Sequence, residues 1–260
     1  MRWINKKRPP KELQEFKAKL DKQKKEDGVP HEKPFGLLKS DPIANPAVQI
    51  ALAKEQGYIC CYCMAAIPIK EGEEERPVAR IEHFKPRSVY DGMNKQPDLR
   101  IDYSNFLLAC ENKHSHCDIK KKDKELCEVF SLTGKRKRVR EKLRIGYTKT
   151  CVIYSQQASI HEDIGGDLKA DKSGDYQEGI LNLNCKSLRD QRKGAWKGVS
   201  KYITRQIDTP KWEDKKAKAL QVAQDLHEKY SNRNKNQKFY PFCEVILYQL
   251  EKRFKELRSI

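Results

Sequence analysis

The sequence predicts an α+β fold, in which a small core stapled by cysteines is embedded in a mostly helical, basic body. Two cysteine pairs, Cys60/Cys63 and Cys110/Cys117, enclose segments of strand character. Apolar residues recur at helical spacing before these pairs and again in the last third of the chain. Lys and Arg number 54 against 37 Asp and Glu, which gives a net charge of +17 over 260 residues.

Composition narrows the class of protein. No run of about 18 apolar residues occurs, so we expect no membrane span. The first ten residues are charged and no apolar stretch follows them, which argues against a secretory signal and for a cytoplasmic protein. The positive charge indicates a polyanionic partner, although a lysine-rich surface can also serve only to keep a protein in solution. Nine cysteines, an odd number in a long chain, do not resemble a disulfide framework.

Three regions are predicted along the chain. Residues 1–46 form a basic arm and one helix, either a docking arm for a partner or an ordinary solvated helix. Its helix carries Leu13, Phe16 and Leu20 on one face and stops near Gly28, and residues 31–46 read as loop. Residues 47–130 form the core, which opens with a short helix over 47–55 that ends at Gly57. Residues 131–260 form a basic, mostly helical region that packs on the core.

The remaining elements follow from local pattern. Strand character runs over 78–84, a loop over 88–104 and a helix over 118–129. Residues 150–180 are β-leaning and rich in glycine turns. Three helices then cover about 188–202, 211–230 and 242–257; apolar stripes in the last two comprise Ala217, Leu220, Ala223 and Leu226, and Val245, Ile246, Leu250 and Phe254.

The two cysteine pairs have metal-like spacing. Cys60, Cys63, Cys110 and Cys117 can give four thiolates to one tetrahedral zinc ion, at Zn–S distances of roughly 2.3 Å. Such a closed site leaves no position for water, so the zinc would be structural and would hold two distant segments together. Six residues separate Cys110 from Cys117, a loose spacing that includes His114 and His116, and either histidine could replace a cysteine. The alternative is that the cysteines are buried as small apolar residues, which we expect for Cys127, Cys151, Cys185 and Cys243.

Glu82 and His83 are the second candidate element. Hydrolysis of a phosphodiester needs a base for the attacking water and a cation for the developing negative charge. A neutral His suits the first task near pH 7, and a carboxylate suits the second because Mg²⁺ prefers oxygen ligands. Neighbouring strand residues point to opposite faces, so this pair must lie at the end of a strand or at a distortion to share a site. A lone His is otherwise more often structural.

This stretch resembles the HNH endonuclease family, whose ββα-metal motif runs Cys-x-x-Cys, Asp/Glu-His, Asn and a second cysteine pair followed by Asn or His. The resemblance implies that His83 is the general base and that Asn105 fixes the loop that orients it. It also implies that Glu82 and Asp118 bind a catalytic Mg²⁺ or Mn²⁺ ion. Asp118 and the wide spacing of the second cysteine pair depart from the family pattern.

Further motifs resemble one subfamily, the HNH nucleases of the Septu anti-phage system, some of which are associated with retrons. They are Arg2-x-Ile4 with Pro9-Pro10 and Leu13, the GYICCYC entry, residues 82–87, and LNLNCKSLRDQRKG at 181–194. The subfamily implies an ABC/SMC-like ATPase partner and, in retron-associated members, a reverse transcriptase with its RNA–DNA. The sequence itself has no GxxxxGK[ST] stretch, so another chain would bind the ATP.

Basic residues near the predicted site are candidate phosphate contacts, although each could be an ordinary surface charge. They are Lys85, Arg87, Lys120, Lys121, Lys135, Arg136, Lys137 and Arg138. Backbone contacts position a substrate without reading its sequence. The HNH resemblance implies DNA as the substrate, with an RNA such as tRNA as the alternative. Two other functions stay open: a non-catalytic zinc-binding module that docks on nucleic acid or protein, and a thiol-redox protein built on Cys60 and Cys63.

Overall fold

A computed structural model describes most of the two ends of the chain and several segments between them. The described residues are 2, 4–28, 31–70, 72, 76–90, 98–111, 116–122, 145–147, 152–154, 179–207 and 212–255. Helices predominate and the sheets are small, in agreement with the predicted mixture of helix and strand.

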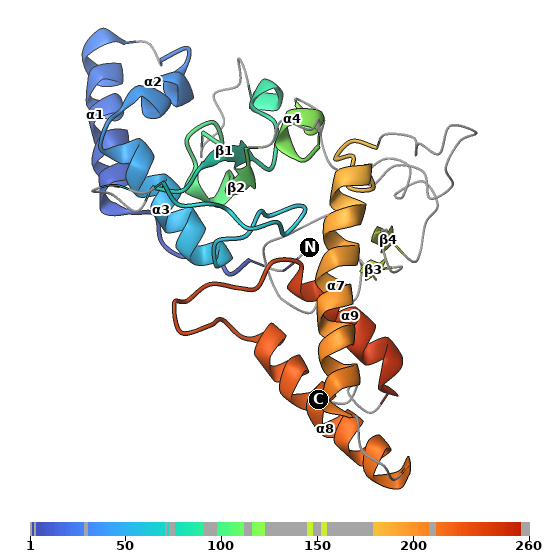
Figure 1. Cartoon of the computed structure of the whole chain (residues 1–260). Coiled ribbons are helices and arrows are strands. Elements are labelled where there is room, and N and C mark those ends of the chain that lie inside the picture. The colour runs from blue at the N-terminus through green and yellow to red at the C-terminus, as the bar shows by residue number, and fades with distance from the viewer. Residues whose placement is uncertain are drawn as a thin grey trace.

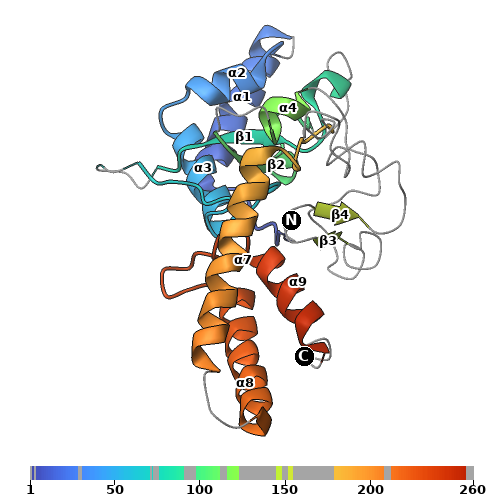
Figure 2. The same ribbon diagram turned by 45° about the vertical axis from the view of Figure 1, so that its right-hand side comes forward.

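The elements form three groups along the molecule (Figure 1). At one end lie the helices α1 (Lys11–Asp27), α2 (Pro34–Ser40) and α3 (Ala44–Gln56). Next to them lie an antiparallel pair of strands and a short helix, β1 (Ala79–His83), β2 (Phe106–Cys110) and α4 (Asp118–Lys121). The other end consists of α7 (Lys186–Gln206), α8 (Trp212–Ser231) and α9 (Cys243–Arg253). A second antiparallel pair, β3 (Ile145–Tyr147) and β4 (Val152–Tyr154), lies beside α9 (Figure 2).

The first three helices follow the sequence pattern except over residues 31–46. Helix α1 buries Leu13, Phe16 and Leu20, as predicted. Helices α1 and α3 end at Gly28 and Gly57, whose φ angles of 73° and 63° lie in the left-handed region that favours glycine. The prediction of a loop over 31–46 is wrong, because α2 forms there. A proline is tolerated in the first turn of a helix, and this helix is held on the core by the buried Leu38.

Strand β2 separates two hydrophobic clusters. It pairs with β1 in a register that sets Ala79 opposite Cys110 and His83 opposite Phe106. Side chains alternate across a strand, so Phe106 and Leu108 join the cluster of α1 and α3, whereas Leu107 joins the cluster of the cysteines. Because both faces are covered, all five residues of β2 are buried. This explains why its sequence, FLLAC, is continuously apolar.

Helices α7, α8 and α9 enclose a third cluster. It comprises Val199, Ile203, Ala223, Leu226, Ile246 and Leu250. The predicted stripes on α8 and α9 are therefore confirmed in part: Ala217 is exposed, and Val245 packs against the cysteine cluster instead. Within the described ranges, no helix combines the length and the apolar character that a membrane crossing requires.

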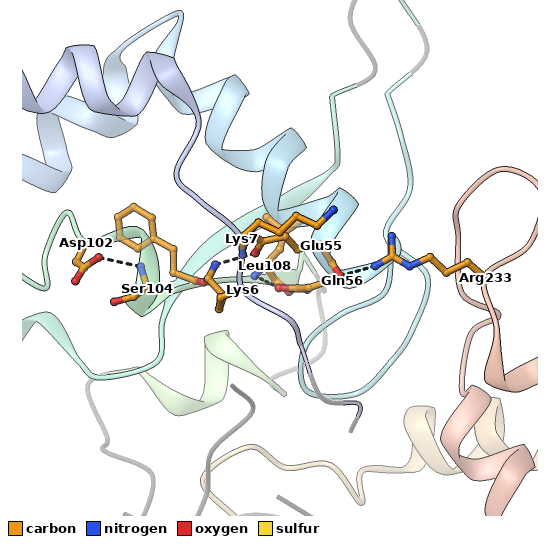
Figure 3. A network of polar contacts seen from close by, with 9 residues as sticks. Lys6, Lys7, Glu55, Gln56, Asp102, Ser104, Leu108 and Arg233 are labelled. Atoms are coloured by element: carbon orange, nitrogen blue, oxygen red, sulfur yellow. Dashed lines mark hydrogen bonds and ion pairs between the residues drawn. The ribbon is translucent and has the colours of Figure 1, made fainter. Parts of the chain in front are cut away.

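The end of α3 is the point where three remote segments meet (Figure 3). Before α1, the Lys6 ammonium lies 2.9 Å from Glu55 Oε2, and the Lys7 amide donates to Glu55 Oε1 at 2.7 Å. Gln56 donates to the Leu108 carbonyl at 2.8 Å and accepts from the Leu108 amide at 2.7 Å. From the loop after α8, the Arg233 guanidinium donates to the Glu55 carbonyl at 2.7 Å. These contacts tie both ends of the chain to β2. The division into regions at residues 46 and 130 stays a prediction.

Substitution of Lys6 by Ala should destabilise the protein far more than substitution of Lys11 by Ala. The Glu55 carboxylate is 2% exposed and would lose its ammonium partner, a change that typically costs about 3–5 kcal/mol. Lys11 also pairs with a glutamate, Glu15, but both side chains are exposed, and such a pair contributes about 0.3–0.5 kcal/mol. Urea unfolding of both variants measures the difference. Equal losses of unfolding free energy would contradict the assigned role of the Lys6–Glu55 pair.

Candidate functional site

Four cysteines form a buried cluster that could hold a metal ion. The sulfur atoms of Cys60, Cys63, Cys110 and Cys117 all lie within 4.8 Å of one another. Two of the separations are 3.9 Å, from Cys60 to Cys117, and 3.7 Å, from Cys63 to Cys110. A tetrahedral zinc with bonds of about 2.3 Å requires sulfurs about 3.8 Å apart. The donor set therefore fits one tetrahedral ion such as zinc.

The backbone around each cysteine explains how the cluster forms. Cys60 and Cys63 lie on a tight turn after α3, in which the Met64 amide donates to the Cys60 carbonyl at 3.1 Å. Cys110 is the last residue of β2, and Cys117 precedes α4 with a left-handed φ of 56°. The Cys117 amide donates to the Leu181 carbonyl at 2.9 Å, which links the cluster to the segment before α7.

The other candidate ligands stay outside the cluster where the structure describes them. His116 Nδ1 lies 3.1 Å from the Cys117 sulfur as a neighbour, while His114 lies outside the described residues. Cys61 is buried beside the cluster, and Cys185 is half-buried. Cys243 is packed in an apolar environment, and burial raises the pKa of its thiol to about 11, as expected for an inert small residue. Cys127 and Cys151 also lie outside the described residues.

A cleft of about 540 Å³ opens next to this cluster. Glu82, His83 and Asp118 all contribute to its lining, together with residues of α2 and α3. His83 is the last residue of β1, so the strand alternation that would separate it from Glu82 ends there. Two carboxyls and an imidazole thus share one cavity, although Asp118 comes from a different element.

His83 is held as a neutral imidazole with one nitrogen available. Its Nε2 lies 2.9 Å from the Arg100 carbonyl, which can only accept, so Nε2 carries the proton and Nδ1 the lone pair. Edge-on contacts to Phe35 and Phe106, with ring centroids 4.4 and 5.0 Å away, fix the ring plane. Burial lowers the pKa of His83 to about 4, and the nearby positive charge of Arg87 acts in the same direction. At neutral pH the ring can therefore accept a proton.

Glu82 is a buried acid that contacts a hydroxyl and an ammonium group. Its Oε1 accepts from the Tyr62 hydroxyl at 2.8 Å and lies 2.7 Å from the Lys121 ammonium. Burial and hydrogen bonding with Asp118 raise the pKa of Glu82 to about 8, and Lys121 opposes the rise. Two carboxyls that adjoin in this way repel each other when both are ionised. Their oxygen donors fit a divalent cation of the Mg²⁺ or Mn²⁺ type, which would stabilise both charges.

Asn105 joins the chain that follows β1 to the loop before β2. Its Oδ1 accepts from the Lys85 amide at 2.8 Å, and its Nδ2 donates to the carbonyls of Lys85 and Leu99 at 3.0 and 2.9 Å. The side chain is buried and its hydrogen bonds hold both segments. Arg100, whose carbonyl receives the His83 ring, follows Leu99 directly, so Asn105 also fixes the surroundings of His83.

Comparison with known proteins gives one partial likeness. No family model matches the sequence, and no solved structure matches the chain. A stretch of 71 residues is 38% identical to a protein of Vibrio cholerae serotype O1 biovar El Tor that is named "Retron Vc95 putative HNH endonuclease". The matched stretch spans 26% of this chain and 30% of that relative. The likeness supports an HNH nuclease.

The basic residues predicted to contact phosphate differ in their exposure. Lys121 is 1% exposed, and its ammonium donates to the His83 carbonyl at 2.9 Å as well as contacting Glu82. The prediction of a phosphate contact at Lys121 is therefore wrong, since both the burial and the partners of this lysine exclude it from the surface. Lys120 is half-buried, whereas Lys85 and Arg87 are exposed, and Arg87 lines the cleft. Residues Lys135, Arg136, Lys137 and Arg138 lie outside the described residues.

Reasoning from the sequence assigned Lys121 a different role and missed Arg80 and Tyr62. Lys121 follows Asp118 at a spacing of three, which puts both on one side of a helix and could have suggested a link to the acids. Arg80 precedes Glu82 by two residues on β1, so the two side chains lie on the same face of the strand. The Arg80 guanidinium lies 3.8 Å from Asp118 Oδ2. Tyr62 lies between Cys60 and Cys63, where no local signal distinguishes a tyrosine that donates a hydrogen bond from one that only packs in the core.

Substitution of Cys60 by Ala should abolish the stoichiometric metal, whereas substitution of the adjacent Cys61 by Ala should leave it in place. Both cysteines are buried, but only Cys60 contributes to the four-sulfur cluster. We expect about one zinc per chain in the parent and in the Cys61 variant, determined by elemental analysis of purified protein. A strong chelator should lower the Tm of the parent and of the Cys61 variant by a large amount, because both would lose the zinc. Equal zinc content in the Cys60 and Cys61 variants would contradict the cluster.

Proposed function

We propose that the protein is a metal-dependent HNH endonuclease that hydrolyses phosphodiester bonds, with β1, β2 and α4 as its ββα-metal core. The observation that carries the proposal is that Glu82, Asp118 and His83 line one cleft. The order of the elements, a strand ending in His83, a second strand ending in Cys110 and a helix beginning at Asp118, agrees with the order of that motif. The partial likeness to an HNH endonuclease from Vibrio supports the same class.

His83, Glu82 and Asp118 each have a task in the proposed reaction. His83 accepts the proton of the attacking water at Nδ1, since Nε2 is engaged with the Arg100 carbonyl. Glu82 and Asp118 would hold a Mg²⁺ or Mn²⁺ ion, which when bound stabilises negative charge on the phosphate and on the leaving oxygen. Lys121 and Tyr62 contact Oε1 of Glu82 and so hold this carboxyl beside Asp118, with which it would share the ion.

The substrate that we propose is DNA, with an RNA such as tRNA as the alternative. The net charge of +17 and the exposed cations Lys85 and Arg87 suit a polyanionic backbone. Lys120 and the predicted basic cluster of residues 135–138 would add to this attraction. Contacts of this kind bind phosphates regardless of sequence, so little base preference is expected.

The His83→Ala variant tests the proposal. Loss of a general base typically lowers the rate roughly a hundred- to ten-thousandfold. Nicking of supercoiled plasmid with Mg²⁺ or Mn²⁺ should fall by this factor, while His31→Ala should match the parent. His31 bonds to Gln23 at the surface of α1 and does not line the cleft. Unchanged nicking by the His83 variant would exclude His83 as the base. Absence of nicking in the parent, with DNA and RNA and with its partner present, would instead favour a non-catalytic zinc-binding docking module.

We further propose that this nuclease is the effector of a Septu-type anti-phage system and acts with an ABC/SMC-like ATPase. The support is the set of shared motifs together with the word retron in the name of the Vibrio relative. Two of these motifs pack within the fold: Arg2 lies 2.6 Å from Glu244 of α9, and Leu181 receives the Cys117 amide. In a retron-associated system, a reverse transcriptase with its RNA–DNA would be a further partner.

Co-expression with the proposed ABC/SMC-like ATPase tests this partnership. The two chains should co-elute in size-exclusion chromatography, and ATP should change the rate of plasmid cleavage by the complex but not by the nuclease alone. The nuclease has no predicted ATP-binding loop, so any effect of ATP requires the second chain. Separate elution at micromolar concentrations, with cleavage indifferent to ATP, would contradict an ATPase partner.

A further inference from the structure

Two of the cations that line the cleft precede β1 in the chain. They are Lys39, in the last turn of α2, and Arg76, which precedes β1. Both line the cleft and both are exposed. Neither appeared among the phosphate contacts predicted from the sequence, because nothing in the local pattern links them to the acids of the site.

A buried amide of α3 orients Arg76. The Gln49 side chain is 9% exposed and is engaged at both ends. Its Nε2 donates to the Ala79 carbonyl at 3.0 Å, and its Oε1 accepts from Arg76 Nε at 3.1 Å. The guanidinium is thus anchored through Nε, and no carboxylate among the residues that the structure describes lies within ion-pair distance of its two terminal nitrogens. Those nitrogens are the pair that binds a phosphate in bidentate fashion.

A second buried amide supports Lys39. Asn45 is 7% exposed and its Nδ2 donates to the Lys39 carbonyl at 2.7 Å, which fastens the last turn of α2 to the start of α3. Both amides line the cleft next to the cations that they support. The Lys39 ammonium has no ion-pair partner within the described part of the chain. Its positive charge is therefore available to a ligand in the cleft.

The remaining charges of the cleft explain why a separate anion site is needed. Arg80 lies 3.8 Å from Asp118, and Arg87 stacks over Phe35 at 4.9 Å. Glu111 and Lys122 also line the cleft, and both are exposed. Lys121, which is buried against Glu82, does not line it. When ionised, the acids Glu82, Glu111 and Asp118 of the cleft repel phosphate, and a cation held by Glu82 and Asp118 would offset this repulsion only at the scissile group. A phosphate further along the backbone needs cations that the acids do not neutralise.

We propose that Lys39 and Arg76 form a second phosphate subsite, which binds the nucleic-acid backbone at a phosphate that is not cleaved. This inference rests on the proposed function, because it assigns the cleft to a phosphodiester substrate. A contact that is the same in the bound substrate and in the transition state lowers KM and leaves kcat unchanged. The subsite therefore sets affinity and the position of the strand, whereas His83, Glu82 and Asp118 set the rate.

The test is the salt dependence of binding, measured by fluorescence anisotropy with labelled single-stranded DNA, duplex DNA and RNA. All proteins carry His83→Ala, so that the probe stays intact. Each lost phosphate contact should reduce the slope of log K against log salt by roughly 0.7 for a single strand and 0.9 for a duplex. We expect this reduction for Lys39→Ala and for Arg76→Ala, with a Kd raised about five- to tenfold at low salt.

Two control variants sharpen the result. Lys22→Ala removes the same charge from an exposed position of α1 that does not line the cleft, and should leave slope and Kd unchanged. Arg76→Lys keeps the charge but not the guanidinium, and should retain the slope while Kd rises about two- to fivefold. In the cleavage-competent parent, Arg76→Ala should raise KM by a similar factor to Kd with kcat unchanged.

The outcomes separate the subsite from the proposed nuclease. If Lys39→Ala and Arg76→Ala match Lys22→Ala in slope, or if no probe binds, the subsite is overturned, whatever the cleavage assay gives. If both reduce the slope while the parent cleaves neither DNA nor RNA, the subsite stands and the nuclease proposal fails. A reduced kcat with unchanged KM in Arg76→Ala would also overturn the subsite, because it would assign the arginine to the chemical step.

Discussion

Convergence of four sulfur atoms is the constraint on which the arrangement of the site depends. Cys60 and Cys63 follow α3, Cys110 ends β2, and Cys117 immediately precedes Asp118 at the start of α4. A tetrahedral ion bound there would fix α4 against the end of β2, and with it the distance between Asp118 and Glu82. Such a staple matters in this chain because β1 and β2 are short, and two strands of five residues are marginally stable without further support. The sulfur cluster and the two hydrophobic clusters on either side of β2 provide that support.

Buried polar groups hold the residues of the cleft in place. Lys121 contacts both the carboxylate of Glu82 and the backbone carbonyl of His83, so one side chain fixes the position of Glu82 relative to His83. Asn105 does the same for the loop that carries Arg100, the partner of the His83 ring. A buried charge or amide without its partner is costly, so each of these contacts specifies one arrangement rather than several. The same principle operates at the end of α3, where Glu55 and Gln56 gather the segment before α1, β2 and the loop after α8.

Two kinds of positive charge lie in and beside the cleft. Lys121 is buried next to it and contacts Glu82, whereas Lys39 and Arg76 are exposed and line it. Asn45 holds the backbone of Lys39, and Gln49 orients the Arg76 side chain. Net charge alone cannot distinguish these tasks, because a lysine counts equally in both. In this protein the helices α2 and α3 are part of the cleft, so the N-terminal region contributes to the site as well as to the core.

The sequence by itself determined the features that depend on local pattern and ligand chemistry. The cysteine pairs, the stripe of Leu13, Phe16 and Leu20, and the glycines that end α1 and α3 were all readable, because helix faces, helix ends and metal ligands have fixed spacing. The neighbouring residues Glu82 and His83 were also singled out from the sequence, by their chemistry and by the family resemblance, and their catalytic roles stay a prediction. Only the tertiary structure decided that Lys121 is buried, that residues 34–40 are helical, and that Lys39 and Arg76 line the cleft. Those outcomes depend on contacts between segments far apart in the chain, and burial and charge pairing over such distances leave no periodic trace in the sequence.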